Sequence, residues 1–198
     1  FSTLKGSVEL RQELLGHMRQ FYSDAAEAAN RSSIKAYVFG EEADQARAFH
    51  LAEMLHRHEI DVYTLDKSIE VNGERFDAGK NYVVPANQRQ YKSITALFER
   101  RTSFQDSLFY DVSAWTMPYA FNLPFVELGD RQFSSNLLGA AFKGVWEPAA
   151  ELIGGESRYA YAFEWDEYYA PRAAYRLQEA GVKTVSYTHL RAHETTLD

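Results

Sequence analysis

Apolar and polar positions alternate along this chain with two different periods. From Ser2 to Asn30 the apolar side chains recur at three- or four-residue steps, which predicts one long amphipathic helix with Ser2 as a plausible N-cap. Ile34–Phe39 then changes to a short run of β-branched and aromatic residues that ends at Gly40, which is typical of a strand. The chain is therefore expected to begin with a long helix and continue into a sheet domain.

The next segments alternate between helix and strand. Glu42–His58 carries an apolar face at helical spacing, and Ile60–Leu65 alternates as a strand does. A strand, a helix and a second strand in this order predict a parallel pair with a right-handed crossover. Asn72-Gly73 predicts a hairpin over Val71–Phe76. The remaining elements are expected as a strand at Asn81–Val84, helices at Gln88–Arg101, Asp106–Tyr110, Met117–Phe121 and Ala170–Ala180, and strands at Arg158–Trp165 and from Val182 onward.

These patterns indicate an α/β fold, with strand-helix-strand units and a parallel sheet preceded by a long helix. The region Thr102–Phe142 mixes aromatic residues, Pro and Asn without a sustained period, so we expect mostly long loops there. The segment after Gly154 resembles the first strand and helix again, and predicts a second α/β unit. The expected organisation is residues 1–33 as a helix, 34–153 as an α/β domain with long aromatic loops, and 154–184 as the start of a second, truncated unit.

The end of the chain has a different character. Val185–Thr195 (VSYTHLRAHET) resembles a translated reading frame of a sequencing-library adapter. We therefore expect residues 185–198 to be an artefact and the rest to be an internal fragment of a longer protein. Because His189 and His193 fall in that tail, their zinc-like spacing carries no functional weight in this interpretation.

Composition excludes several kinds of site. The 198 residues carry 21 Lys and Arg against 28 Asp and Glu, a formal charge of −7, which gives no nucleic-acid footprint. Cysteine is absent, so thiolate zinc sites and cysteine nucleophiles are excluded within the chain. No run of about 18 apolar residues predicts a membrane span.

Five stretches together resemble the carboxypeptidase A-like family of zinc carboxypeptidases, in particular its large multidomain bacterial members. They are STLKGSVELRQELL (Ser2–Leu15), AYVFG (Ala36–Gly40), YVVPANQRQY (Tyr82–Tyr91), the long run Ala96–Leu123 that contains TSFQDSLFYDVSAWT, and Tyr159–Lys183 with FEWDEYYAPRA.

The resemblance implies that residues 1–33 are the closing helix of an upstream peptidase domain that holds zinc, and that the rest is a non-catalytic accessory region. It further implies a peptide substrate, a secreted or periplasmic location, and an amidotransferase-like domain after Thr184. No catalytic or zinc-binding residue of the family maps onto this chain. An alternative hypothesis is an α/β module that binds carbohydrate or peptide without catalysis.

A few side chains are candidates for sites of their own. Tyr159, Tyr161, Phe163 and Trp165 alternate, so a strand would present all four on one face, either as a stacking platform for a ligand or as a packed core. His56-Arg57-His58-Glu59 contains H-x-x-E, but the helix end on which it lies explains the histidines as well. Two weaker groups are the carboxylates Glu164, Asp166 and Glu167, and the loop residues Asp106, Asp111, Trp115 and Asn122.

Overall fold

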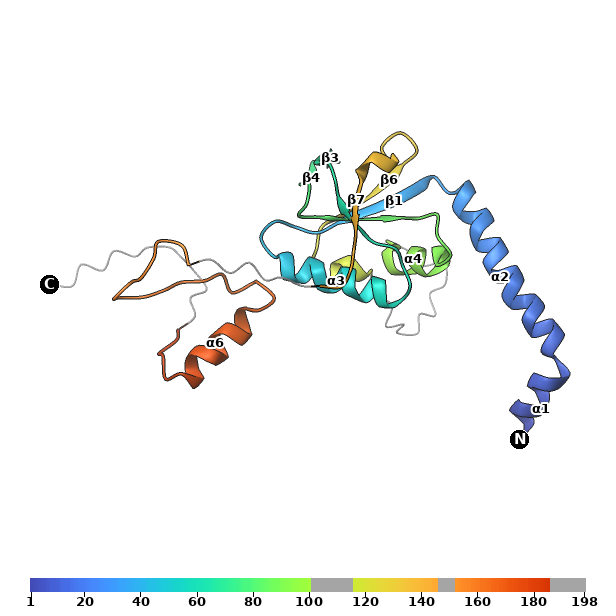
Figure 1. The fold of residues 1–198 in the computed structure, drawn as a ribbon, viewed down its shortest axis with the longest axis horizontal. Coiled ribbons are helices and arrows are strands. Elements are labelled where there is room, and N and C mark those ends of the chain that lie inside the picture. Colours follow the sequence, from blue (N-terminus) through green and yellow to red (C-terminus); the bar gives the residue numbers. More distant parts are fainter. Residues whose placement is uncertain (101–115, 146–151, 186–198) are drawn as a thin grey trace, which may run out of the picture. The chain divides into compact units, whose positions relative to one another are not determined.

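The computed structural model describes residues 1–100, 116–145 and 152–185, and it divides the chain into two compact units (Figure 1). The first unit is Phe1–Glu147 and the second is Pro148–Asp198.

A five-stranded sheet forms the centre of the first unit. Its strand order is β6-β1-β5-β2-β7, and every neighbouring pair is antiparallel. The strands are β1 (Ile34–Phe39), β2 (Tyr63–Leu65), β5 (Tyr82–Pro85), β6 (Phe125–Gly129) and β7 (Leu138–Ala141).

The predicted parallel sheet of strand-helix-strand units is therefore wrong. β1 is antiparallel to β5, with Tyr37 opposite Val84, and β5 is antiparallel to β2, with Val83 opposite Tyr63. β1 and β2 consequently run in the same direction, but β5 lies between them and takes the hydrogen bonds that a parallel pair would share. The order of elements along a chain does not reveal a later strand that enters between two earlier ones, and this is why the prediction failed.

A two-stranded hairpin, β3 (Ile69–Val71) and β4 (Glu74–Phe76), confirms the predicted Asn72-Gly73 turn. Asn72 and Gly73 have φ angles of 54° and 83°, the left-handed pair that a type I′ turn requires. Asp77, just after the hairpin, accepts hydrogen bonds from Arg75 and Ser68 and so holds the two ends of the hairpin together.

Two apolar clusters, one on each face of the sheet, make up the core. In β1 the side chains of Tyr37 and Phe39 belong to one cluster, while Ala36 and Val38 belong to the other, as the two-residue period of a strand requires. Helices α3 (Gln45–Arg57) and α4 (Tyr91–Phe98) cover the first face, and the β3-β4 hairpin covers the second (Figure 1). Because both faces are covered, β1 is apolar at nearly every position.

The predicted N-terminal helix is present, but it consists of α1 (Ser2–Glu9) and α2 (Arg11–Arg31). Leu10 separates them, with φ −98° and ψ 15°. Leu10 N donates a hydrogen bond to Gly6 O, and Leu14 N donates one to Leu10 O. Both bonds join residues four apart, as in an α-helix. The chain nevertheless forms two helices that are separated at Leu10.

Several smaller predictions are confirmed and others are corrected. The short helix α5 (Met117–Ala120) lies where a helix was expected. Asp44 caps α3 by accepting a 2.9 Å hydrogen bond from the backbone N of Arg47, which was not predicted. β6 and β7 occupy the region that was expected to be mostly loops, because each strand is too short to show a clear period.

In the second unit α6 (Ala170–Glu179) is confirmed, and Gly181 follows it with φ +78°, as a helix end favours. Residues 158–165 form no strand, however, and neither do residues 182–185. A local alternation alone does not form a strand, because a strand also needs a neighbour with which to hydrogen-bond. The expected helix Asp106–Tyr110 lies outside the described residues.

Candidate docking surface

An extended apolar feature of the first unit is a stripe along α1 and α2, which we call the helix stripe. Phe1, Val8, Leu15, Tyr22 and Ala29 follow one another at seven-residue steps, and Leu4, Met18 and Ala25 take the intermediate positions. Within each of the two helices this spacing puts the stripe residues on one side, as in the seam of a coiled coil. Leu14 and Phe21 widen the stripe along one edge.

The C-terminal end of the helix stripe packs on the sheet domain. Ala25 and Ala29 are buried, each 1 % exposed. Close to them, Asn87 Nδ2 donates a 3.2 Å hydrogen bond to Asn30 Oδ1, and Lys35 Nζ donates one of 3.1 Å to Asn30 O.

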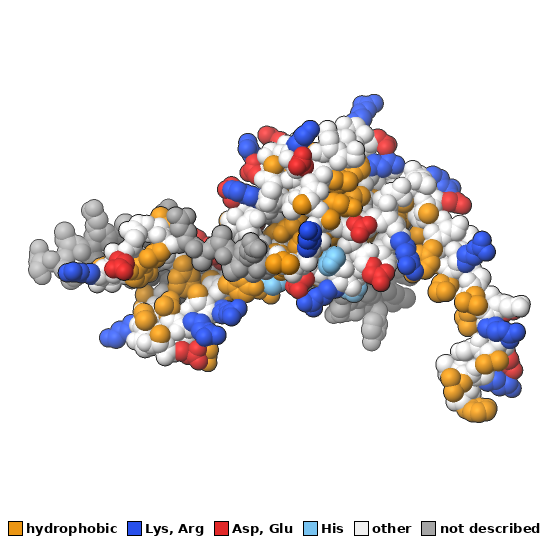
Figure 2. All heavy atoms as spheres, viewed as in Figure 1, with side chains coloured by type: hydrophobic (Ala, Val, Ile, Leu, Met, Phe, Trp, Pro, Cys, Tyr) orange, Lys and Arg blue, Asp and Glu red, His pale blue; other side chains and the backbone are white. Residues whose placement is uncertain are grey.

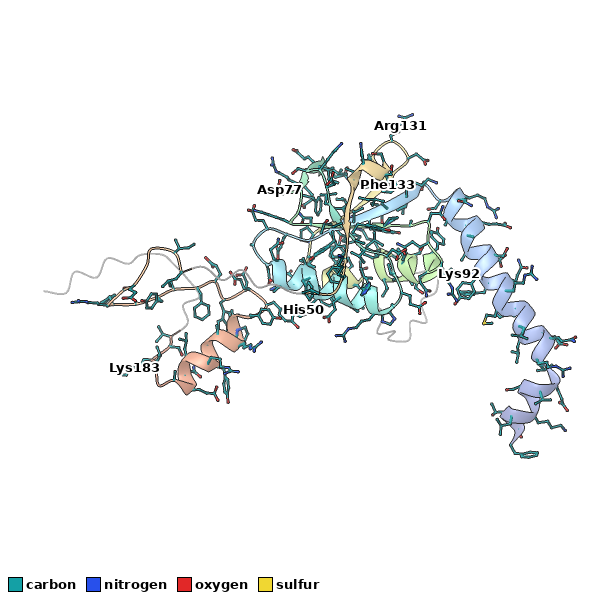
Figure 3. All side chains as sticks on the ribbon, in the orientation of Figure 1. His50, Asp77, Lys92, Arg131, Phe133 and Lys183 are labelled. Atoms are coloured by element: carbon teal, nitrogen blue, oxygen red, sulfur yellow. The ribbon has the colours of Figure 1, made fainter. Side chains whose placement is uncertain are left out.

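Cations from α4 and the preceding turn lie over the aromatic side chains of α2. The Lys92 ammonium is 3.8 Å from the Phe21 ring centroid, and the Arg89 guanidinium is 4.8 Å from that of Tyr22 (Figure 3). Cation–π contacts of this kind are attractive and place the charge against an apolar surface without burying it fully. The last turns of α2 are therefore held to α4.

The N-terminal end of the same stripe is exposed. Phe1, Leu4, Val8, Leu15 and Met18 are each more than half exposed, with Leu4 at 72 % and Leu15 at 60 %. Figure 2 shows their apolar surface along α1 and α2. Single exposed apolar side chains are ordinary on protein surfaces, but a contiguous row of them marks an interaction site. The helix stripe is thus covered at one end and open at the other.

Charges are distributed unequally around these helices. Lys5, Arg11 and Arg19 each lie three or four residues from two members of the helix stripe, so all three border or interrupt it. The acidic residues Glu13 and Glu27 have no stripe member at these spacings and lie on the other side of the helix. The open end of the stripe is therefore apolar with a basic border.

The aromatic residues that the sequence singled out are not gathered on a strand face. Tyr159 is 99 % exposed, Tyr161 and Trp165 are 57 % and Phe163 is 47 %. They lie in an irregular segment, in which the Tyr161 hydroxyl accepts a 2.8 Å hydrogen bond from the backbone N of Ser157. The expected single face is absent, and the side chains are accessible to solvent instead of forming a core.

The remaining candidates are dispersed. His56 packs edge-on against the Phe142 ring, His58 is the C-cap of α3, and Glu59 has φ 57° at the turn that follows. Within the described ranges no three His, Asp or Glu side chains converge in a way that could hold a metal ion.

The acidic residues Glu164, Asp166 and Glu167 are exposed, and Asn122 takes a left-handed turn position with φ 52°. Asp106, Asp111, Trp115, His189 and His193 lie outside the described residues.

The shifted acid–base groups belong to the framework of the fold. Burial, reinforced by the negative charge of Glu127, raises the pKa of Tyr37 to about 12, and burial also raises the pKa of Tyr82. A hydrogen bond from Arg75 lowers the pKa of Asp77, and one from Arg57 lowers that of Glu53. Tyr37 and Tyr82 are core or near-core residues, and the carboxylates form local surface pairs, so these shifts reflect packing and not a catalytic arrangement.

Comparison with known proteins adds no relative. No protein-family model matches the chain, and no curated protein or solved structure is significantly similar to it. Among the described helices, none has both the length and the apolar character that a bilayer crossing requires. The helix stripe is therefore the feature from which function has to be argued.

Proposed function

We propose that this chain is a non-catalytic accessory region of a zinc-dependent metallocarboxypeptidase, and that it attaches to the peptidase domain through the helix stripe. One observation carries the proposal: a row of apolar side chains is covered by the sheet domain at Ala25 and Ala29 and is open from Phe1 to Met18. A stripe that continues past its own domain is suited to bridging two folded bodies. The five sequence stretches that resemble zinc carboxypeptidases supply the identity of the second body.

In this proposal the parent protein hydrolyses a peptide bond next to a free C-terminus by means of zinc-activated water. The zinc ligands and the general base belong to the peptidase domain, and the parent is secreted or periplasmic. The present chain contributes attachment and not catalysis. The open half of the stripe loses its unfavourable contact with water only when another surface covers it. Burial of that half would fix the accessory region to the enzyme.

The first test is to sequence the gene across both ends of this chain and to assay the complete product. We expect H-x-x-E, a later His and a Glu to be encoded before Phe1. The product should release the last residue of a peptide with a free C-terminus and spare the same peptide when it is C-terminally amidated. Chelation should abolish the activity and added Zn²⁺ should restore it. A complete product without these ligands, or one whose peptidase activity survives chelation, would contradict the proposal.

The alternative, a module that binds carbohydrate or peptide, is favoured by the exposure of Tyr159, Tyr161, Phe163 and Trp165. Exposed aromatic rings stack on sugars and on extended peptides. This hypothesis expects saturable ligand binding that is lost in Trp165→Ala with no change in unfolding. The matched control is Tyr175→Ala, at an exposed aromatic residue of α6. Binding that is lost equally in both variants, or retained in both, counts against this alternative.

A further inference from the structure

The charge distribution around the helix stripe indicates what kind of surface covers it. Arg11 lies within the stripe, three residues after Val8 and four before Leu15. Arg19 lies at its edge, four residues after Leu15 and three before Tyr22. Lys5 has the same relation to Phe1 and Val8, and it is 3.7 Å from Glu9 in an exposed ion pair.

From this arrangement we infer that the open half of the stripe docks on a protein surface with an apolar groove bordered by Asp and Glu carboxylates. The inference rests on the proposed function, because it specifies the partner of the same helices. A guanidinium brought into an interface is desolvated, and this is costly unless a carboxylate pairs with it. A carboxylate at the edge of the groove pairs with Arg19, and one within the groove pairs with Arg11, which lies between Val8 and Leu15.

The open half of the stripe is continuous with an interface that already exists at its covered end. The covered end of the stripe already uses this combination of an apolar centre and a charged border, since Ala25 and Ala29 are buried while Lys92 and Arg89 lie over Phe21 and Tyr22. On the covered half the cations come from the sheet domain, whereas on the open half they are carried by the helix. Lys5 is paired with Glu9 within the helix, so Arg11 and Arg19 are the cations for which the proposed partner supplies carboxylates.

A second copy of the chain fits this surface poorly. In a parallel, in-register pair Arg11 would face Arg11 in the same apolar layer, and like charges at such positions are destabilising. Reversing one helix does not supply an acid, because the charged residues that border the open stripe are Lys5, Arg11 and Arg19 in both copies.

A membrane surface fits poorly as well. A helix lying in the bilayer interface concentrates Lys and Arg on its polar face. Here the side opposite the stripe carries Glu13, and Glu27 on that side is paired with Arg31 at 2.7 Å, so Lys and Arg are not concentrated there.

The test is hydrogen exchange on the complete protein, read at the amides of residues 4–18. We compare Arg11→Glu/Arg19→Glu with Glu13→Lys/Glu27→Lys, which changes the charge by the same amount on the opposite side of the helices. The inference expects the arginine pair to speed exchange by at least about tenfold, because an interfacial charge then faces carboxylates. The glutamate pair should have little effect. Urea unfolding of the sheet domain should be unchanged in both, since these side chains are exposed in the first unit.

Four results would overturn the inference. They are equal effects of the two charge variants, fast exchange of residues 4–18 in the unmodified protein, dimerisation of the 198-residue chain that is lost in Leu15→Asp, and binding of the chain to phosphatidylserine vesicles. Zinc-dependent carboxypeptidase activity is measured on the same samples. Slow exchange that depends on the arginines, in a protein without that activity, would refute the proposed enzyme and leave the docking inference standing. Zinc-dependent carboxypeptidase activity together with equal effects of the two charge variants would support the proposed enzyme and refute the docking inference.

Discussion

The ammonium group of Lys92 lies 3.8 Å from the centroid of the Phe21 ring and joins α4 to α2. Phe21 is 42 % exposed, so the contact is made at the surface and screened by water. It is one of the interactions that hold the stripe-bearing helix to the sheet domain, and its strength can be measured.

A double-mutant cycle on Phe21→Leu and Lys92→Met should give a coupling free energy of about 0.5–1 kcal/mol, the range for exposed cation–π pairs. The measurement is the unfolding free energy of the four proteins in urea. Lys67→Met, which removes an exposed loop lysine, serves as the control and should show no coupling to Phe21→Leu. A coupling near zero for Lys92 as well would mean that this contact does not help to hold α2 to the sheet domain.

Phe98 should be the more sensitive aromatic position in the sheet domain. It is fully buried, and its ring stacks on Tyr37 with centroids 4.5 Å apart and lies close to Phe39 and Phe125. Phe98→Ala should cost roughly 3–5 kcal/mol of unfolding free energy, since it removes these contacts and leaves a cavity. Phe163→Ala, at a half-exposed position, should cost much less in the same urea titration. Similar costs at the two positions would contradict the assignment of Phe98 to the core.

Gly40 at the end of β1 should not tolerate alanine. Its φ is +121°, and a Cβ there would come within 2.9 Å of Asn81 Oδ1. Gly40→Ala should therefore cost about 1–3 kcal/mol of unfolding free energy. Gly73→Ala is the matched control, because Gly73 also has a positive φ but nothing lies within 4 Å of its added Cβ.

The difference between the two glycine variants measures the steric conflict with Asn81. Adding Asn81→Ser, which shortens that side chain, should restore part of the stability lost in Gly40→Ala. If Gly40→Ala and Gly73→Ala cost the same, the backbone angle alone explains both.

Tyr37 should make the fold sensitive to alkali. Its pKa is raised to about 12, so at pH below 10 the hydroxyl is protonated in both the folded and the unfolded chain. Between pH 10 and 12 the unfolded chain loses this proton first, and the free energy of unfolding should fall by roughly 2–3 kcal/mol across that window. Tyr37→Phe should flatten this decline, whereas Tyr175→Phe, at an exposed position, should leave it unchanged. Urea unfolding at a series of pH values from 8 to 12 provides the measurement.

The sequence predicted local structure better than it predicted sheet topology. The strand Ile34–Phe39, the Asn72-Gly73 turn, and the helix that ends before Gly181 were all recognised, because each depends on side chains close together in the sequence. The antiparallel order was not, because it depends on pairings such as Tyr37 with both Val84 and Glu127, which are far apart in the chain.

The sequence predicted only part of the candidate docking surface. The periodicity predicted an apolar helix face, but not that its covered part would end near Ala25, because that depends on where α4 packs. The alternating aromatic residues from Tyr159 to Trp165 predicted a strand that the structure does not contain. A two-residue period is a property of the side chains alone, and none of the strands in the described residues pairs with that segment.

The position of β5 has a consequence for the order in which the chain acquires its shape during synthesis. Residues 34–65 contain β1, α3 and β2, but the strand that hydrogen-bonds to both β1 and β2 is made only later, at residues 82–85. A nascent chain that has emerged only as far as β2 therefore has two strands and no ladder between them. Once Tyr82–Pro85 is present, it can hydrogen-bond to both β1 and β2. The strands β6 and β7 can then pair with the outer edges of β1 and β2. A chain that stops before this point leaves β1 and β2 without the strand to which both hydrogen-bond in the folded domain.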